Sequence, residues 1–350
     1  LLREVGELYA RILAAGSSDA TPAPAPLEIQ PALAPLEIQP ALAPLEIQYG
    51  DFALWQREWL QGEALERQLA YWRTQLSGAA ALELPTDFVR RSVRLSRGRP
   101  LPLRIEPDLI EALRQRSAEQ GLTLFMTLLT AFKLVLARAS GELDVSVGIP
   151  VANRTHAQLE PLIGFFVNTL VLRTSLAGDP LVSELLRRVR SVALEAYEHQ
   201  DAPFELVVDA VGVERDLERP PLCSVLFALQ NAPHADVSLP NLDVQAYAPD
   251  TGTAKLDLTL ALYEAAHGGI EGSLEYDADL FAEDTVRSWS DLFHTVLHAL
   301  VSQPHARISQ LHLLPEPARK RLLVDWNTTR RPYPLDRSIP QLFTQIAARQ

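Results

Sequence analysis

Hydrophobic residues recur along the chain with two different periods, which together predict a mixture of helices and strands. Spacing of three to four residues predicts helices over 1–15, 49–76, 107–120, 123–139, 181–198 and 283–301. Strand character, clearest in the alternation over 144–151, is expected over 101–105, 144–151, 168–174, 224–230, 256–263 and 270–276. Because strands and helices do not alternate strictly, we expect a mixed-sheet α/β sandwich rather than a doubly wound nucleotide fold.

A nine-residue unit recurs in a proline-rich segment after the first predicted helix. Pro26–Gln30, Pro35–Gln39 and Pro44–Gln48 each read P-L-E-I-Q. Solenoid repeats are normally longer and need an apolar face to stack on their neighbours. We interpret residues 20–48 as an expanded linker loop in extended geometry, in which each extra copy adds about 28 Å of reach. A specific binding role is the alternative to a simple tandem duplication.

Composition and charge exclude several classes of function. The 350 residues exceed what one core usually spans, so two lobes or domains are expected. The net charge of −12 argues against nucleic acid as a partner. The single cysteine, Cys223, excludes a disulfide framework and a thiolate zinc site, fits a reducing cytoplasm, and is expected to be a small buried hydrophobe. The most apolar stretch, Leu122–Leu136, is too short for a bilayer and contains Lys133, so no membrane segment is expected.

Both ends of the chain fall within helical patterns. The pattern that begins at Leu1 has no capping residue before it, and the pattern that begins at Ile339 stops at Gln350. A signal peptide is not expected, because a basic leader and a small-residue cleavage site are both missing. We therefore expect the chain to be an internal piece of a longer protein.

Several common catalytic motifs do not occur in the sequence. It has no G-x-S-x-G elbow, phosphate loop, dinucleotide glycine fingerprint or H-E-x-x-H pair. His294 and His298 stand four residues apart on one predicted helix and could in principle share a metal. Without a nearby carboxylate partner, a solvated or packed helix face is favoured, and no metal site is expected.

Four short motifs remain, and their order and spacing carry a resemblance. They are Tyr49–Trp55 (YGDFALW), Ile163–Arg173 (IGFFVNTLVLR), His199–Glu205 (HQDAPFE) and Arg215–Leu222 (RDLERPPL). Together they resemble the condensation domain of nonribosomal peptide synthetases, most closely the subtype that accepts an L-configured donor. The first three match the family motifs throughout, whereas Glu218 stands where serine is usual in the fourth. The sequence W-N-T-T at 326–329 resembles the linker into an adenylation domain.

The resemblance implies a fold and a division of the chain. The family has a chloramphenicol-acetyltransferase-like fold, with two lobes arranged as a V. Residues 1–98 are then a remnant of the first lobe, residues 99–315 the complete second lobe, and residues 316–350 the linker and start of an adenylation domain.

The resemblance also implies the partners. Donor and acceptor carrier domains present aminoacyl or peptidyl thioesters on phosphopantetheine arms, in a tunnel between the lobes. An adenylation domain is the neighbour, and nucleic acid and membranes are not partners. No cofactor is expected to bind this chain directly, and the cytoplasm is the expected location.

The family's reactive motif, H-H-x-x-x-D-G, does not occur in these residues. In relatives it lies immediately before a helix that resembles Leu1–Ile12, so the resemblance implies no catalytic residue within this chain. We therefore expect the isolated chain not to form amide bonds. An epimerisation domain of the same fold is one alternative, although the adenylation-type linker argues against it. A non-catalytic remnant that docks carrier or adenylation domains is another.

Residues of the motifs and of a neighbouring strand are the candidates for the site. Asn168, Thr169 and Ser224 are candidates to line the tunnel or orient the pantetheine arm, with ordinary strand hydrogen bonding as the alternative for each. Asp51 is expected to cap a helix rather than bridge the lobes, and His199 to complement a helix C-terminus. Arg173 is expected to pair with a carboxylate. The remaining structural candidates are Tyr49, Trp55, Gly164, Asp201, Arg215 and Asp216.

Overall fold

A computed structural model of the chain provides the fold. It describes residues 5–6, 8–10, 44–80, 82–91, 95–213, 220–230, 241–242, 251–265, 267–314, 319–331 and 336–348. The first two copies of the nine-residue repeat, and the candidates Arg215 and Asp216, lie outside the described residues. The chain divides into two compact units, Leu1–Leu311 and His312–Gln350. Our division at residues 98 and 315 stays a prediction.

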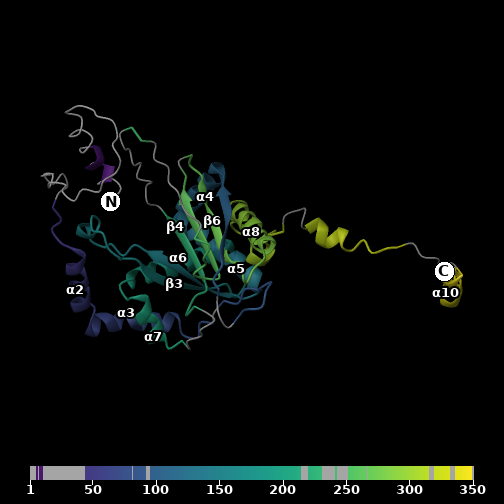
Figure 1. Cartoon of the computed structure of the whole chain (residues 1–350), viewed down its shortest axis with the longest axis horizontal. Coiled ribbons are helices and arrows are strands. Elements are labelled where there is room, and N and C mark those ends of the chain that lie inside the picture. Colours follow the sequence, from purple (N-terminus) through teal and green to yellow (C-terminus); the bar gives the residue numbers. More distant parts are fainter. Residues whose placement is uncertain are drawn as a thin grey trace, which may run out of the picture. The chain divides into compact units, whose positions relative to one another are not determined.

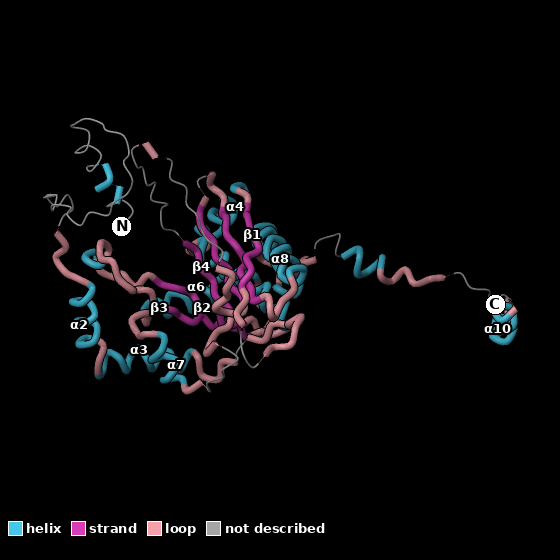
Figure 2. The backbone as a smooth tube through the Cα atoms, in the orientation of Figure 1, coloured by secondary structure: helices cyan, strands magenta, loops and turns pink. Residues whose placement is uncertain are grey.

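A six-stranded mixed sheet forms the centre of the first unit (Figure 2). Its strands are β1 (Gly98–Ile105), β2 (Asp144–Val151), β3 (Asn168–Ser175), β4 (Val225–Gln230), β5 (Leu258–Glu264) and β6 (Ile270–Asp277). They lie in the order β1-β6-β5-β4-β2-β3. The pairs β4–β5 and β2–β4 are parallel and the others antiparallel. The predicted mixed sheet is confirmed, and all six predicted strands exist.

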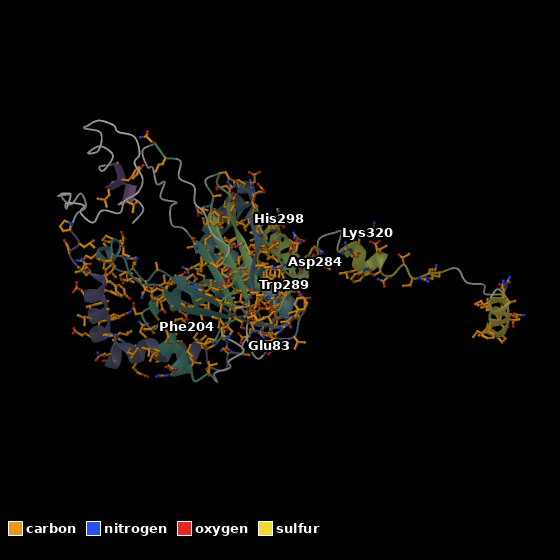
Figure 3. The ribbon with its side chains drawn as sticks, viewed as in Figure 1. Glu83, Phe204, Asp284, Trp289, His298 and Lys320 are labelled. Atoms are coloured by element: carbon orange, nitrogen blue, oxygen red, sulfur yellow. The ribbon has the colours of Figure 1, made fainter. Side chains whose placement is uncertain are left out.

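Four helices of the first unit form a layer on one face of this sheet (Figure 1). They are α4 (Pro107–Glu119), α5 (Leu124–Ser140), α6 (Val182–Glu198) and α8 (Glu283–Ser302). The central helix is α5, which contacts the other three and β2 and has a continuous buried run from Met126 to Ala137. Strand residues that point toward the helices are fully buried, as Phe227 and Leu260 show. Trp289, labelled in Figure 3, contributes a buried indole from α8.

The predicted helix over 49–76 is two helices in the structure. They are α2 (Tyr49–Trp59) and α3 (Gly62–Gln75), separated at Leu60 and Gln61. The backbone of Gly62 has a φ of 54°, which glycine adopts without the penalty a side chain would bring. The break turns α3 away from the direction of α2 (Figure 1). One further helix, α7 (Phe204–Val211), was not predicted; Pro203 precedes it at the N-cap.

A second, smaller hydrophobic cluster lies outside the main core. Phe52 of α2 packs there with Leu159, Leu162 and Phe166, which belong to the segment between β2 and β3. Ile47, from the third copy of the repeat, packs against the same cluster and is partly buried. This last copy of the unit is therefore part of the folded structure.

The second unit contains a short π-helix, η3 (Arg321–Asp325), and α10 (Ile339–Ala347), which begins after a capping box between Ser338 and Gln341. The apolar face of α10, with Ile339, Phe343 and Ile346, is exposed. Within the described ranges, no single helix is long and apolar enough to cross a membrane, and only the bent pair α4–α5 passes by length and composition.

Candidate functional site

Three of the four motifs meet around the start of β3. The first contact joins the first motif to the second: the Tyr49 hydroxyl donates a hydrogen bond of 3.0 Å to the carbonyl oxygen of Phe165. The Tyr49 ring also meets Phe166 edge-on, with the ring centroids 5.1 Å apart. Phe166 in turn lies 4.8 Å from the ring of Phe52. The start of α2 is thereby fastened to the segment that leads into β3.

Gly164 makes this contact possible because it has no side chain. A Cβ added there would lie 2.2 Å from the Tyr49 ring, closer than any real contact of that kind. The ring therefore lies directly on the Gly164 backbone. This gives the glycine of the second motif a packing reason, which the sequence did not provide.

Asn168 joins the second motif to the third. Its side-chain nitrogen donates to the carbonyl oxygens of Gln200 and Ala202, both at 2.8 Å. Its side-chain oxygen accepts from the backbone N–H groups of Thr169 at 2.9 Å and Phe204 at 3.1 Å. Phe204, labelled in Figure 3, is the first residue of α7. All four bonds go to backbone groups, so the amide holds the turn between α6 and α7 against the start of β3.

His199 joins the third motif to α3. It is the C-cap residue of α6, and its Nδ1 lies 2.8 Å from the carbonyl oxygen of Glu195. The imidazole stacks on the ring of Tyr71 with centroids 4.1 Å apart, and the His199 carbonyl accepts from the indole N–H of Trp72 at 2.9 Å. The expected position of His199 at a helix C-terminus is confirmed.

Arg173 is paired with a carboxylate, as predicted. Its guanidinium binds Asp144 across the β2–β3 pair, with the closest contact at 2.7 Å. Its Nη1 also donates to the carbonyl oxygens of Gln75 at 3.2 Å and Ser77 at 2.7 Å. The Gln75 side chain returns a hydrogen bond of 3.1 Å to the Arg173 carbonyl. The end of α3 therefore covers the free edge of β3.

Asp51 has the helix-capping role that was expected, although at a different position. It is the third residue of α2 rather than the N-cap, and its carboxylate accepts from the Gln48 backbone N–H at 2.8 Å. Trp55, one turn later, stacks on Trp59 with centroids 5.4 Å apart and meets the ring of His156 edge-on at 5.8 Å.

Asp201 is the half-buried carboxylate of the third motif. Burial raises the pKa of its carboxyl group above the ordinary value, and the charge of nearby His156 opposes that shift. His156 therefore contacts Trp55 of the first motif and acts through its charge on Asp201 of the third. No feature of the sequence around His156 had pointed to this position.

Gly148 of β2 lies between Thr169 and Cys223, the residue before Ser224. A Cβ at Gly148 would lie 2.8 Å from the sulfur of Cys223 and 3.7 Å from the Thr169 methyl carbon. Ser224, next to Cys223, is buried, and its hydroxyl donates a long bond of 3.4 Å to the Leu82 carbonyl. Burial raises the pKa of the Cys223 thiol to about 12, in agreement with the predicted inert hydrophobe. A substrate role for Asn168, Thr169 and Ser224 stays a prediction.

Sequence reasoning missed several residues that hold this region together. They are Tyr71, Trp72 and Gln75 on α3, together with Asp144 and His156. The run of aromatic residues in 49–72 was the only signal for two of them. Partners such as Asp144 carry no sequence signal, because their role depends on which strand lies next to them.

A cavity of about 360 Å³ opens beside the first motif. Its lining residues come from the third repeat copy, from α2 and from the segment after β2: Ile47, Asp51, Phe52, Trp55, His156, Gln158 and Leu159. The lining is largely apolar, with Asp51 and His156 as its charged or titratable members. Among the residues that the structure describes, no cluster of three or more histidine, cysteine or acidic side chains could hold a metal. Both ring nitrogens of His294 face backbone carbonyl oxygens, of Ser290 at 2.9 Å and Arg104 at 2.7 Å.

Comparison with protein families identifies one match over most of the chain. The family model described as "Condensation domain" matches residues 36–323. Among curated proteins, one of the subunits of linear gramicidin synthase from Brevibacillus parabrevis is 45% identical over 306 residues, covering 86% of this chain and 6% of the relative. Malpinin synthetase of Mortierella alpina is 40% identical over 346 residues, covering 99% of this chain and 4% of the relative. The chain thus spans less than a tenth of the length of these relatives.

Solved structures share the fold. The X-domain from teicoplanin biosynthesis superposes with a TM-score of 0.73 at 30% identity, covering 79% of this chain and 64% of that one. The first condensation domain of the CDA synthetase superposes with a TM-score of 0.61 at 16% identity, covering 76% and 57% of the two chains. At that identity, the second likeness concerns the fold alone.

Proposed function

Because the chain belongs to the condensation-domain family, we propose that it works within a nonribosomal peptide synthetase and helps to join two carrier-bound acyl groups through an amide bond. In this reaction the acceptor's amine nitrogen attacks the thioester carbonyl carbon of the donor. The new C–N bond replaces the C–S bond, the donor carrier's phosphopantetheine thiol leaves, and the amine's proton is passed on to balance the thiolate. The synthetase relatives support this assignment.

The observation that carries the proposal is the meeting of three family motifs at the start of β3. Asn168 fixes the turn at 200–204 to the strand, and Tyr49 fixes α2 to the segment before it. Such a rigid arrangement suits a wall that must present a tethered substrate in one orientation. In this proposal Asn168 is a positioning residue, and the adjacent Thr169, together with Ser224 immediately before β4, faces the pantetheine arm.

The partners in this proposal are a donor carrier, an acceptor carrier and an adenylation domain. Phosphopantetheine arrives covalently attached to the carriers, so this chain needs no cofactor of its own. Tethering supplies effective concentrations on the order of millimolar, which makes high free affinity unnecessary. The helix α10, with its exposed apolar face, would begin the adenylation domain. The L-donor subtype and a cytoplasmic location belong to the same proposal.

The 350 residues alone are proposed to be inactive, because H-H-x-x-x-D-G does not occur among them. General-base assistance typically contributes 10²–10⁴-fold. The test loads donor and acceptor carriers with labelled aminoacyl groups and measures dipeptide by mass spectrometry. We expect product from a synthetase module that includes both this chain and that motif, and none from the 350 residues. Dipeptide from the isolated chain would refute its inactivity; no dipeptide from the folded module would refute the condensation function.

A second candidate is a recruiting platform without condensation activity. The observation that favours it is the likeness to the teicoplanin X-domain, one structure of which is a complex with OxyB. The same module distinguishes the two functions. A platform would give no dipeptide in this module, whereas a condensation domain would give dipeptide and would lose it when Asn168 is replaced.

A further inference from the structure

Lys133 occupies the most buried environment of any basic residue that the structure describes. It lies in the middle of α5 with no exposed surface, surrounded by the apolar side chains of the main core. Its amine donates to the carbonyl oxygen of Val145 on β2 at 2.9 Å and to that of Leu172 on β3. A single side chain thus connects the central helix to both strands of the β2–β3 hairpin.

The number of carbonyl oxygens that the Lys133 amine contacts equals the number of N–H donors in a neutral amine. A neutral –NH₂ group has two N–H donors, whereas the ammonium has three. The two observed hydrogen bonds account for both donors of the neutral form, and a charged amine would carry a third N–H and a full charge into the core. Burying a charge without a counter-ion is costly, and a lysine can avoid that cost by releasing its proton.

The charged groups around Lys133 do not supply a free counter-ion. The negative charge of Asp144, at the start of β2, favours the protonated form of Lys133, but Arg173 already binds that carboxylate. Several charged or titratable groups of the neighbouring elements have partners of their own: Arg114 with Glu264, Arg116 with Glu119, Arg188 with Glu184, Arg138 with the Ile308 carbonyl, Arg190 with the Gly121 carbonyl, and His294 with two carbonyls. His298, labelled in Figure 3, is exposed.

Lysine is a rare residue in this chain, whose basic residues are nearly all arginines. Only Lys133, Lys255 and Lys320 are lysines, and the other basic residues among its 32 are arginines. Arginine stays protonated under nearly all conditions, whereas a buried lysine changes its pKa readily. Lys255 and Lys320 are both exposed. Among the described residues, the one basic side chain that is fully buried is therefore of the type that can lose its proton.

We propose that Lys133 is a proton-linked clamp: it binds α5 to the β2–β3 hairpin as a neutral amine, and the proton it releases on folding makes the domain more stable at mildly alkaline than at neutral pH. The clamp acts on the hairpin that carries Asn168 and Arg173. This inference does not depend on the proposed function.

The direction of the pH dependence follows from the two states. Burial lowers the pKa of Lys133 from its ordinary 10.5 to about 7, and the charge of Asp144 opposes that shift. Between these values the unfolded chain binds a proton that the native chain does not, so the free energy of unfolding rises with pH. The buried Cys223 thiol acts in the opposite direction above about pH 9, because only the unfolded thiol then loses its proton. The effect of Lys133 on the free energy of unfolding is therefore not opposed by Cys223 between pH 7 and about 8.5.

Urea unfolding across this window tests the clamp. The chain is compared with Lys133→Met, which keeps an unbranched side chain without the amine, and with Lys320→Met as an exposed control. We expect the unfolding constant of the unsubstituted chain to fall by up to about tenfold per pH unit relative to Lys133→Met. Lys320→Met should follow the unsubstituted chain. Parallel pH profiles for the unsubstituted chain and Lys133→Met would overturn the proposal.

A second measurement does not depend on whether Lys133→Met folds. In Lys255→Arg/Lys320→Arg, Lys133 is the only lysine left, so the NMR signal of ¹³Cε-labelled lysine reports on it alone. In the folded protein, this signal should titrate with a midpoint near pH 7, at least two units below the midpoint in urea. A folded-state midpoint near that of the unfolded chain would refute proton release.

Discussion

Replacing Asn168 by alanine removes four hydrogen bonds at the place where two motifs meet. The amide group donates to Gln200 and Ala202 and accepts from Thr169 and Phe204, all through their backbones. Alanine leaves two carbonyl oxygens and two N–H groups without these partners. The turn that leads into α7 then loses its attachment to β3.

The expected loss follows from the number and exposure of these bonds. A typical hydrogen bond contributes about 0.5–1.5 kcal/mol net, so four bonds give an upper range of about 2–6 kcal/mol. Asn168 is only half-buried, and water can reach some of the freed backbone groups. We therefore expect Asn168→Ala to lower the free energy of unfolding by about 2–4 kcal/mol.

Two further variants separate the parts of this interaction. Asn168→Asp keeps the two accepted bonds but places a carboxylate oxygen against two carbonyl oxygens, so we expect a loss at neutral pH that is at least as large. Thr169→Val keeps the shape of the adjacent residue and removes only its hydroxyl, for which the described structure shows no hydrogen bond. Its expected effect is below about 0.5 kcal/mol.

The assay is urea unfolding at pH 7.5, followed by tryptophan fluorescence and circular dichroism. Coincident transitions from the two probes are needed before free energies are compared. A loss below about 0.5 kcal/mol for Asn168→Ala would refute the structural role of its side chain. An unchanged stability for Asn168→Asp would show that the two donated bonds do not matter. Peptide formation by the Asn168→Ala module, measured well below its unfolding midpoint, then reports on positioning.

Gly164→Ala should lower the urea midpoint by an amount equivalent to about 1–3 kcal/mol, because the new methyl group would overlap the Tyr49 ring. Gly50→Ala, where a Cβ meets nothing within 4 Å, is the matched control and should not destabilise; equal losses from both would contradict the packing argument. Cys223 should stay unmodified by a thiol reagent at pH 8 until the chain unfolds, because it is buried and burial raises its pKa to about 12. Complete modification of the native chain within minutes would show that the thiol is accessible.

Most of the secondary structure could be predicted from the sequence, because hydrophobic periodicity is a local signal. The strand 144–151 matches β2 at both ends, and α4, α6 and α8 differ from their predicted limits by one residue at an end. The misses have local causes as well. The break between α2 and α3 depends on a left-handed glycine within a continuous helical pattern, and α7 is too short for periodicity to identify.

The site was only partly predictable. The motifs identified Asn168, Arg173 and His199 as important positions, and the chemistry of arginine implied a carboxylate partner. Neither the identity of that partner, Asp144, nor the aromatic contact of His199 with Tyr71 could be predicted. Both depend on which strand or helix packs beside the residue, and the local sequence pattern does not predict which elements become neighbours.

The sequence by itself determined the family, the mixed α/β character and the approximate position of nearly every element, because motif order and periodicity are written along the chain. Tertiary structure alone decided the strand order, the packing of the Tyr49 ring on the Gly164 backbone and the burial of Lys133 against two strands. The physical reason is common to all three. Strand pairing, steric contact and desolvation depend on distances between residues that are far apart in sequence, and these distances exist only after the chain has folded.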